Sequence, residues 1–286
     1  MELPGWAAVV PQILSMSLFW LRVAVAFYGL GLLYALLALA RRHEVLSRII
    51  VPVMGVGFVL HVVSLTEHFA THGYLESTTI HVSQSLLAFL LMVFFTGIYV
   101  RYRTTAPGIF VFPLVFLLTF SAAVGQQPPQ FTSPLLRSGW IFLHIALIFT
   151  GYAALFFSFA ASLLYLLQER SLKLKRATGL VSRLPALEVI DQMGYRSLLL
   201  GFPFMTFGIV AGSVIAQVEF GASYFSDPKV ALSLLMYGVY IVLLYTRWNS
   251  GWRGRRAAFL STFAFLAAVL AWAANYVSTM HRFVAP

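Results

Sequence analysis

The chain reads SGWIFLHIALIFTGYAALFFSFAASLLYLL between residues 138 and 167, without one charged side chain. A helix needs about 20 predominantly apolar residues to cross the hydrocarbon core of a bilayer, so this stretch is long enough to span a membrane. Backbone N–H and C=O groups in lipid must be paired inside the segment itself, and a single segment achieves this only as a helix. The stretch therefore predicts a transmembrane helix.

Similar stretches recur along the whole chain. Uncharged or nearly uncharged runs of sufficient length occupy residues 13–40, 49–66, 80–100, 107–124, 138–167, 197–218, 230–246 and 257–277. We expect an all-α, polytopic integral membrane protein with about eight transmembrane helices, forming one transmembrane domain over residues 1–286. The first run is too long for the apolar part of a cleaved signal and has no basic leader, so we expect it to be retained.

The composition excludes the main alternatives. Of the 286 residues, 60% are hydrophobic and only 10% are charged, whereas soluble domains are about one quarter charged. Disordered chains are also excluded, because they are poor in apolar residues. The chain has no cysteine, which rules out disulfides, iron–sulfur clusters and covalent c-type heme attachment within it.

The basic residues indicate which side each connection faces. If the connections alternate between sides, 15 of the 19 Lys and Arg share one side: Arg41, Arg42, Arg48, Arg101, Arg103, Arg170, Lys173, Lys175, Arg176, Arg183, Arg196, Arg247, Arg253, Arg255 and Arg256. Lys and Arg are enriched in cytoplasmic loops, so we expect this side to be cytoplasmic and both termini to lie outside. The net charge of +10 is then a topology signal, and no nucleic-acid partner is expected. The basic, amphipathic connection 168–196 is expected to lie along the cytoplasmic surface.

Six of the seven histidines fall in the outer half of the membrane or just beyond it. His144 lies six residues into its predicted span and His61 five residues from the outer end of its own, a depth of roughly 9 Å for His144 and similar for His61. Two imidazoles at matched depth could flank one planar ligand, and ionisable residues inside membranes are generally functional. The alternative is that each ring hydrogen-bonds a neighbouring carbonyl or hydroxyl group.

A second group of histidines lies nearer the outer surface. His61, His68 and His72 would share one stripe if the second helix continues that far. His68 and His72 could then bind a metal ion with Glu67 or Glu76, although a solvated loop is the favoured interpretation.

Heme is the planar ligand that best suits neutral imidazoles, which are good axial ligands for its iron. Arg22 is expected near the outer interface, where it is a candidate partner for a heme propionate, unless it only extends to the lipid headgroups. His281 follows the last predicted span and could reach a site at the outer surface. Aromatic residues are abundant but fill any helical membrane core.

Several segments carry a specific pattern. They are Leu143-His144 with Gly151-Tyr152-Ala153; Leu187-Glu188, Asp191, Tyr195, Gly201-Phe202-Pro203, Thr206, Gly208-Ile209 and Gly212; and Gly251-Trp252-Arg253-Gly254-Arg255-Arg256-Ala257. From the second predicted span to the C-terminus the chain resembles the cytochrome c assembly family, which includes CcsA-type, CcmC-type and HemX-like membrane proteins. His61 sits where HemX-like members carry a histidine.

This resemblance implies a heme site at the outer surface, where a tryptophan-rich loop and two histidines hold a non-covalent, b-type heme. His144 and His281 occupy the positions of those iron ligands, and residues 219–229 correspond to the loop. Asp227-Pro228-Lys229 matches the end of the loop motif, whereas Phe220, Tyr224 and Ser226 replace its tryptophans. Tyr245 stands where CcsA-type members have a further histidine. In its motifs the chain is more similar to CcsA-type members. In the replacement of these tryptophans and of this histidine it is more similar to HemX-like members.

The leading hypothesis is a membrane protein of cytochrome c maturation that holds or delivers heme at the outer face. It would be no stand-alone enzyme but a possible subunit of a heme-attachment system in a bacterial-type cytoplasmic (inner) membrane. Because the chain has no large outer domain, its partners would be a second membrane protein that has one, and apocytochrome c. The alternatives are a HemX-like regulator of tetrapyrrole synthesis acting through a cytoplasmic partner, a b-type heme electron carrier, and a small-molecule permease.

Overall fold

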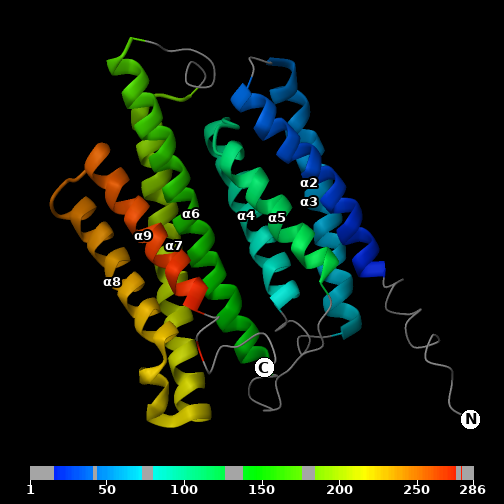
Figure 1. Cartoon of the computed structure of the whole chain (residues 1–286), viewed down its shortest axis with the longest axis vertical. Coiled ribbons are helices and arrows are strands. Elements are labelled where there is room, and N and C mark those ends of the chain that lie inside the picture. The colour runs from blue at the N-terminus through cyan, green and yellow to red at the C-terminus, as the bar shows by residue number, and fades with distance from the viewer. Residues whose placement is uncertain are drawn as a thin grey trace, which may run out of the picture. The chain divides into compact units, whose positions relative to one another are not determined.

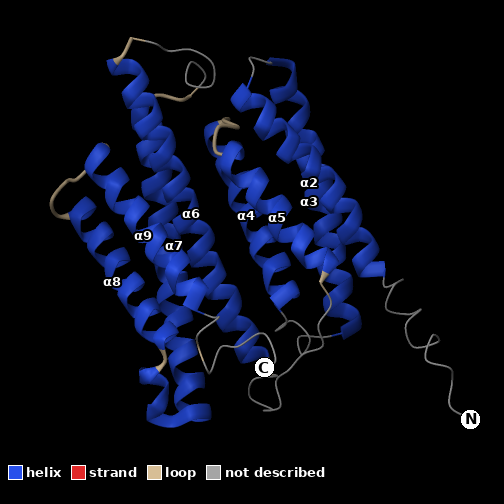
Figure 2. Cartoon of the chain, viewed as in Figure 1, coloured by secondary structure: helices blue, strands red, loops and turns tan. Residues whose placement is uncertain are grey.

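The computed structural model of the chain describes residues 16–40, 44–72, 80–125, 138–175, 184–274 and 278. Within them every regular element is a helix (Figure 2), which confirms the all-α prediction. The elements, labelled in Figure 1 where there is room, are α2 (Met16–Ala40), α3 (Glu44–His72), α4 (Ile80–Tyr102), α5 (Gly108–Val124), α6 (Gly139–Lys173), α7 (Leu187–Phe220), the 3-10 helix η3 (Gly221–Ser226), α8 (Pro228–Trp248) and α9 (Arg255–Ala273).

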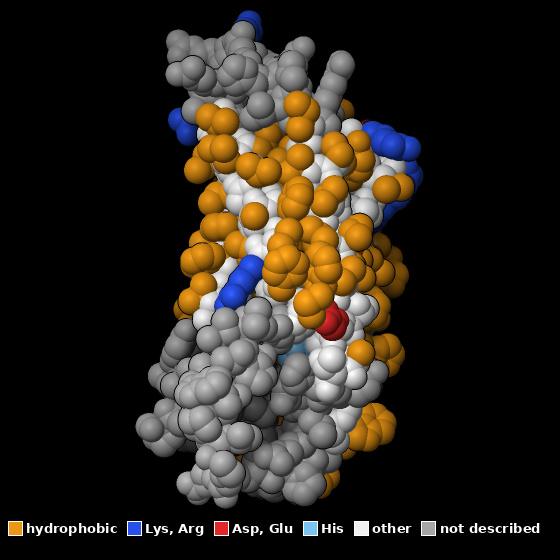
Figure 3. Space-filling view, turned by 90° about the vertical axis from the view of Figure 1, so that its right-hand side faces the viewer, with side chains coloured by type: hydrophobic (Ala, Val, Ile, Leu, Met, Phe, Trp, Pro, Cys, Tyr) orange, Lys and Arg blue, Asp and Glu red, His pale blue; other side chains and the backbone are white. Residues whose placement is uncertain are grey.

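Each of the eight predicted spans coincides with one of the described α-helices. Seven of these helices are long and apolar enough to cross a membrane, and hydrophobic side chains form a broad band on the face drawn in Figure 3. The protein is thus a multi-pass membrane protein. α5 has 17 residues, a length of about 25 Å, which lies at the lower limit for a transmembrane helix.

Two helices extend well beyond the predicted spans. α6 continues to Lys173 and α7 already begins at Leu187. Ile190, Met193 and Gly194 are buried in this first part of α7, so tertiary packing extends the helix past its purely apolar run. Within segment 168–196, which we expected to lie along the cytoplasmic surface, residues 168–173 and 187–196 continue α6 and α7 as helix; that the segment is cytoplasmic stays a prediction. Residues 176–183 lie outside the described residues.

The chain divides into two compact units. Unit 1 comprises residues 1–92 and 109–129, and unit 2 comprises residues 93–108 and 130–286. The boundary runs through α4, so its first part belongs to unit 1 and its last part to unit 2. That the two units act as one transmembrane domain stays a prediction.

Unit 1 is built around the packing of α2 on α3. At Gly57 an added Cβ would lie 2.9 Å from Cβ of Phe27 and 3.1 Å from the ring of Tyr28. The glycine thus lets the two helices approach closely, as small residues do at helix interfaces in membranes.

Unit 2 contains α6, α7, α8 and α9, which surround a core that includes Leu155, Met205 and Tyr240. Gly194, Gly201 and Gly208 follow one another at intervals of seven residues on α7, a spacing that keeps them on one face of a helix. All three face α6, where a Cβ would press against Ala161, Ala154 and Ile148 respectively. Close contact between α6 and α7 therefore depends on these glycines.

The two ends of unit 2 differ in character. One end, the arginine-rich end, carries Arg170 on α6, Arg247 on α8, Arg253 in the α8–α9 connection and Arg255 on α9. The opposite end carries the first residue of α6, η3, the start of α8 and Ser278. His144 lies on α6 near this opposite end, together with residues 219–229.

Candidate functional site

His144 is held against α7 by one of its ring nitrogens. Its Nδ1 lies 2.7 Å from the backbone oxygen of Gly208. The ring occupies the space that a Cβ on Gly212 would fill, and no other described residue is as close to that position. Two glycines one helical turn apart on α7 therefore make room for one imidazole from α6. Hydrogen bonding to a carbonyl was the alternative considered from the sequence, and it holds for Nδ1.

This bond determines the tautomer of His144. A carbonyl oxygen can only accept a hydrogen bond, so Nδ1 must carry the proton. In the neutral ring the lone pair then lies on Nε2, because Nδ1 holds the proton that it donates to Gly208. Histidines that bind metals typically donate their other N–H to a carbonyl or carboxylate in this way. The arrangement is that of a prepared ligand.

A carboxylate and an ammonium group lie at the same end of unit 2. Asp227 caps α8: its Oδ1 accepts a hydrogen bond from the backbone N–H of Lys229 at 2.8 Å. Lys229, whose backbone N–H makes this bond, lies at the same end of unit 2 as His144. Sequence reasoning placed Arg22 beside the ligand but missed Lys229, although the motif Asp227-Pro228-Lys229 contains it.

The aromatic residues of segment 219–229 are arranged unevenly. Tyr224 is buried, and its ring centre lies 4.1 Å from that of the exposed Phe225. Phe220, the last residue of α7, is half-buried, and Ser226 is exposed. The aromatic ring that η3 exposes is therefore that of Phe225, which packs on the buried Tyr224.

His61 lies in the core of unit 1 and is completely buried. Its Nδ1 is 3.3 Å from Oη of Tyr28 on α2, and its Nε2 is 2.8 Å from Oγ of Ser85 on α4. The ring of Phe89 also contacts it edge-on. Both ring nitrogens are therefore engaged, and His61 links three helices. Neither Tyr28 nor Ser85 was recognised from the sequence.

The other residues that the sequence suggested as heme or metal ligands lie at separate places in the fold. Arg22 is exposed on α2 in unit 1, and Tyr245 is 59% exposed on α8. α3 does continue to His72 as the stripe of histidines required. Among the described residues, however, no group of three or more His, Asp or Glu side chains could hold a metal ion. His281 and Glu76 lie outside the described residues.

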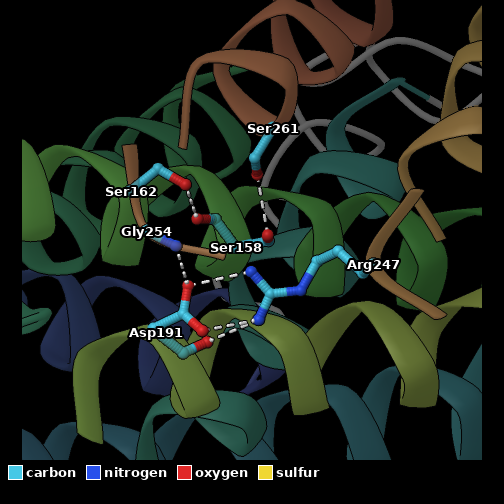
Figure 4. A network of polar contacts seen from close by, with 6 residues as sticks. All are labelled: Ser158, Ser162, Asp191, Arg247, Gly254 and Ser261. Carbon is cyan, nitrogen blue, oxygen red and sulfur yellow. Dashed lines mark hydrogen bonds and ion pairs between the residues drawn. The ribbon is translucent and has the colours of Figure 1, made fainter. Parts of the chain in front are cut away.

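A polar network at the arginine-rich end was not anticipated (Figure 4). Asp191 on α7 accepts hydrogen bonds from Nη1 and Nη2 of Arg247 on α8, at 2.9 and 2.8 Å, and its Oδ1 also accepts from the N–H of Gly254 at 3.1 Å. The guanidinium lies 4.7 Å above the ring centre of Tyr195. The network therefore ties α7, α8 and the start of α9 together.

Beside this network is a small cavity of about 20 Å³, large enough for about one water molecule. Polar residues in its lining include Asp191, Arg247, Ser158, Ser162 and Ser261, and Oγ of Ser158 lies 2.7 Å from Oγ of Ser261. Nothing in the sequence indicated that these residues lie together, because they come from four different helices.

Comparison with known proteins assigns the chain to a family. The sequence profile described as cytochrome C assembly protein matches residues 23–281. The chain belongs to the cytochrome c assembly protein family. The match covers α6 to α9 and therefore both His144 and Asp227.

The chain is also similar in sequence to individual proteins named cytochrome c biogenesis protein CcsA. The chain is 27% identical over 236 residues to the cytochrome c biogenesis protein CcsA of Heterosigma akashiwo, covering 70% of this chain and 73% of that protein. It is 24% identical over 295 residues to CcsA of Pyropia yezoensis, covering 89% and 87% respectively. A shorter match, 34% identical over 149 residues, covers 45% of this chain and 49% of CcsA from Parasynechococcus marenigrum.

Proposed function

We propose that the protein acts in cytochrome c biogenesis by holding or delivering heme at the outer face of the membrane. The observation that carries this proposal is His144, whose protonated Nδ1 is fixed by Gly208 and whose Nε2 is left with a lone pair. Membership of the cytochrome c assembly family supports it, as do the relatives, which are named cytochrome c biogenesis proteins.

In this proposal His144 and His281 are the iron ligands. Bound heme would supply the iron–porphyrin group that is transferred to a client protein. Gly208 orients the imidazole of His144 and keeps its Nδ1 protonated, while Lys229 provides a positive charge for a heme carboxylate. Tyr224 and Phe220 provide aromatic surface for the porphyrin, and Asp227 holds the loop. Arg22, exposed on α2 in unit 1, stays a candidate partner for a heme propionate.

The proposal gives His61 a structural role instead of iron ligation. To coordinate iron it would have to break its bond to Tyr28 or to Ser85 and leave a buried polar group unpaired, which costs about 1–3 kcal/mol. Its three-helix network explains its burial without a ligand.

The orientation and the partners complete the proposal. Because Lys and Arg favour the cytoplasmic side, the arginine-rich end would face the cytoplasm and the His144 end the outside of a bacterial-type cytoplasmic membrane, with both termini also outside. The protein would act with a second membrane protein that carries an outer domain for apocytochrome c.

An absorption spectrum of the purified protein tests the proposal. Protein from heme-replete cells should show a Soret band, and His144→Ala should lose it, whereas His68→Ala, a half-buried histidine of α3, should keep it. Colourless protein that also fails to bind added heme would defeat the proposal.

Deletion of the gene tests the cellular role separately. Loss of c-type cytochromes is expected. Normal cytochromes with altered porphyrin synthesis would instead favour a regulator of tetrapyrrole synthesis.

A further inference from the structure

The cavity at the arginine-rich end of unit 2 is bordered by two serines whose hydroxyl groups bond to each other. Oγ of Ser158 on α6 lies 2.7 Å from Oγ of Ser261 on α9, and both residues are only 2% exposed. Two hydroxyl groups carry two hydrogens, and the bond between them uses one of these. The second hydrogen therefore needs an acceptor other than the partner serine.

A carbonyl of the preceding helical turn is the usual acceptor for a serine inside a helix. Ser162 and Ser197 donate in this way to the backbone oxygens of Ser158 and Met193. Within the described part of the chain, the hydroxyls of Ser158 and Ser261 have their bond to each other and no such bond to a carbonyl. Buried polar groups are nearly always hydrogen-bonded, so we expect the acceptor in the cavity beside the pair.

The carboxylate of Asp191 also lines this cavity and can accept a further hydrogen bond. Its Oδ1 accepts from Nη1 of Arg247 and from the N–H of Gly254, whereas its Oδ2 accepts from Nη2 of Arg247. A carboxylate has about two acceptor positions on each oxygen, so one position remains on Oδ2. The cavity thus brings together a donor that needs an acceptor and an acceptor that can take another donor (Figure 4).

Size and charge decide what this cavity can hold. Its volume of about 20 Å³ accommodates about one water molecule, and a buried water needs roughly two to four polar partners. The charged residues of its described lining, Asp191 and Arg247, form an ion pair and cancel each other's charge. The guanidinium would repel a bound cation and the carboxylate would repel a bound anion. A neutral molecule of the size of water is therefore the occupant that fits.

We propose that the cavity is the binding site of one internal water molecule. The water accepts the second hydrogen of the Ser158–Ser261 pair and donates to the carboxylate of Asp191. A bridging water is nearly as favourable in enthalpy as a direct hydrogen bond. It links the serine pair of α6 and α9 to the ion pair of α7 and α8, so the four helices share one polar network. The site is independent of heme and of the proposed function, because it lies at the end of unit 2 opposite His144.

A density map of the full chain, from crystals grown in a lipid phase and at a resolution that shows ordered water, tests the site directly. We expect a peak in the cavity within hydrogen-bonding distance of a hydroxyl of the serine pair and of a carboxylate oxygen of Asp191. A cavity without a peak, in a map that shows other buried waters, overturns the proposal. A peak that reaches only one of these two groups overturns it as well, because such a water would not link them.

Replacement of both serines tests the role of their second hydrogen. With Ser158→Ala and Ser261→Ala combined, the water loses its donor and the peak should be lost. Tyr240→Phe is the matched control: Tyr240 donates a buried bond to the oxygen of Leu198 but is not among the residues that line the cavity, so the peak should remain. Circular dichroism establishes that each variant is folded. An unchanged peak in the double variant overturns the role of the serines, and the parent map decides the site even if that variant does not fold.

Discussion

At the scale of single residues, the two buried histidines show how surroundings decide a role. His61 has partners for both ring nitrogens, Tyr28 and Ser85. His144 has one on Nδ1, the oxygen of Gly208. The same side chain thus links three helices in unit 1, whereas in unit 2 it is bonded to α7 through Nδ1.

The space beside Gly212 that holds the His144 ring can be altered without replacing His144 itself. Gly212→Ala would place a Cβ in the position of the ring, so we expect heme affinity to fall about tenfold or more while His144 remains present. Overpacking of this kind also costs about 1–3 kcal/mol of stability. Gly238→Ala is the matched control, because its Cβ would meet nothing within 4 Å. Equal heme titrations for Gly212→Ala and the parent would contradict this role of the space beside Gly212.

Replacing His61 should affect stability and not the heme spectrum. His61→Ala removes a fully buried ring and two hydrogen bonds, so the free energy of unfolding should fall by about 2–5 kcal/mol. Thr66→Ala, exposed on the same helix, should change it by less than about 0.5 kcal/mol. Denaturant titration in detergent measures both. A folded His61→Ala protein without a Soret band would make His61 an iron ligand after all.

At the scale of elements, polar contacts at the helix ends add to the apolar core of unit 2. Arg247 lies in the last turn of α8, where the helix dipole favours its positive charge, and it meets Asp191 in the second turn of α7. Their bidentate pair is only 16% and 8% exposed respectively. Asp227 plays the corresponding part at the other end by capping α8.

Breaking the Asp191–Arg247 pair should be far more harmful than breaking an exposed pair. Arg247→Ala leaves a largely buried carboxylate without its cation, which costs about 3–5 kcal/mol. Lys173→Ala breaks the exposed pair with Glu169 and should cost less than about 1 kcal/mol. Unfolding free energies of both variants measure the difference. Equal losses would mean that the network does not hold the α7–α8–α9 end together.

At the scale of the whole molecule, the distribution of charge sets the expected topology. The absence of cysteine makes single introduced cysteines unambiguous reporters. Ser223→Cys in η3 should react with a membrane-impermeant maleimide in intact cells, whereas Lys173→Cys at the end of α6 should react only after the membrane is opened. Both side chains are exposed. Labelling of Lys173→Cys from outside would reverse the orientation and place the candidate heme site on the cytoplasmic side.

The sequence by itself determined the helices and the family resemblance. Each long apolar run, such as residues 138–167, became a helix, because backbone groups in lipid must bond within their own segment and this is a local requirement. Residue patterns around His144 and Asp227 were sufficient to suggest the cytochrome c assembly family, since they are short motifs within single helices and loops. Helix ends were predicted less well. Packing of its first turns extends α7 to Leu187, ahead of the predicted apolar span.

Only the tertiary structure decided which side chains meet. His144 finds Gly208, Asp191 finds Arg247 and Asp227 finds Ser278 across 64, 56 and 51 residues respectively. The pattern of apolar residues carries no information about such partners. Helices that are surrounded by lipid and by one another are nearly equally apolar on every face. The physical reason is that helix formation in a membrane is local, whereas the pairing of buried polar groups depends on how helices distant in sequence pack together.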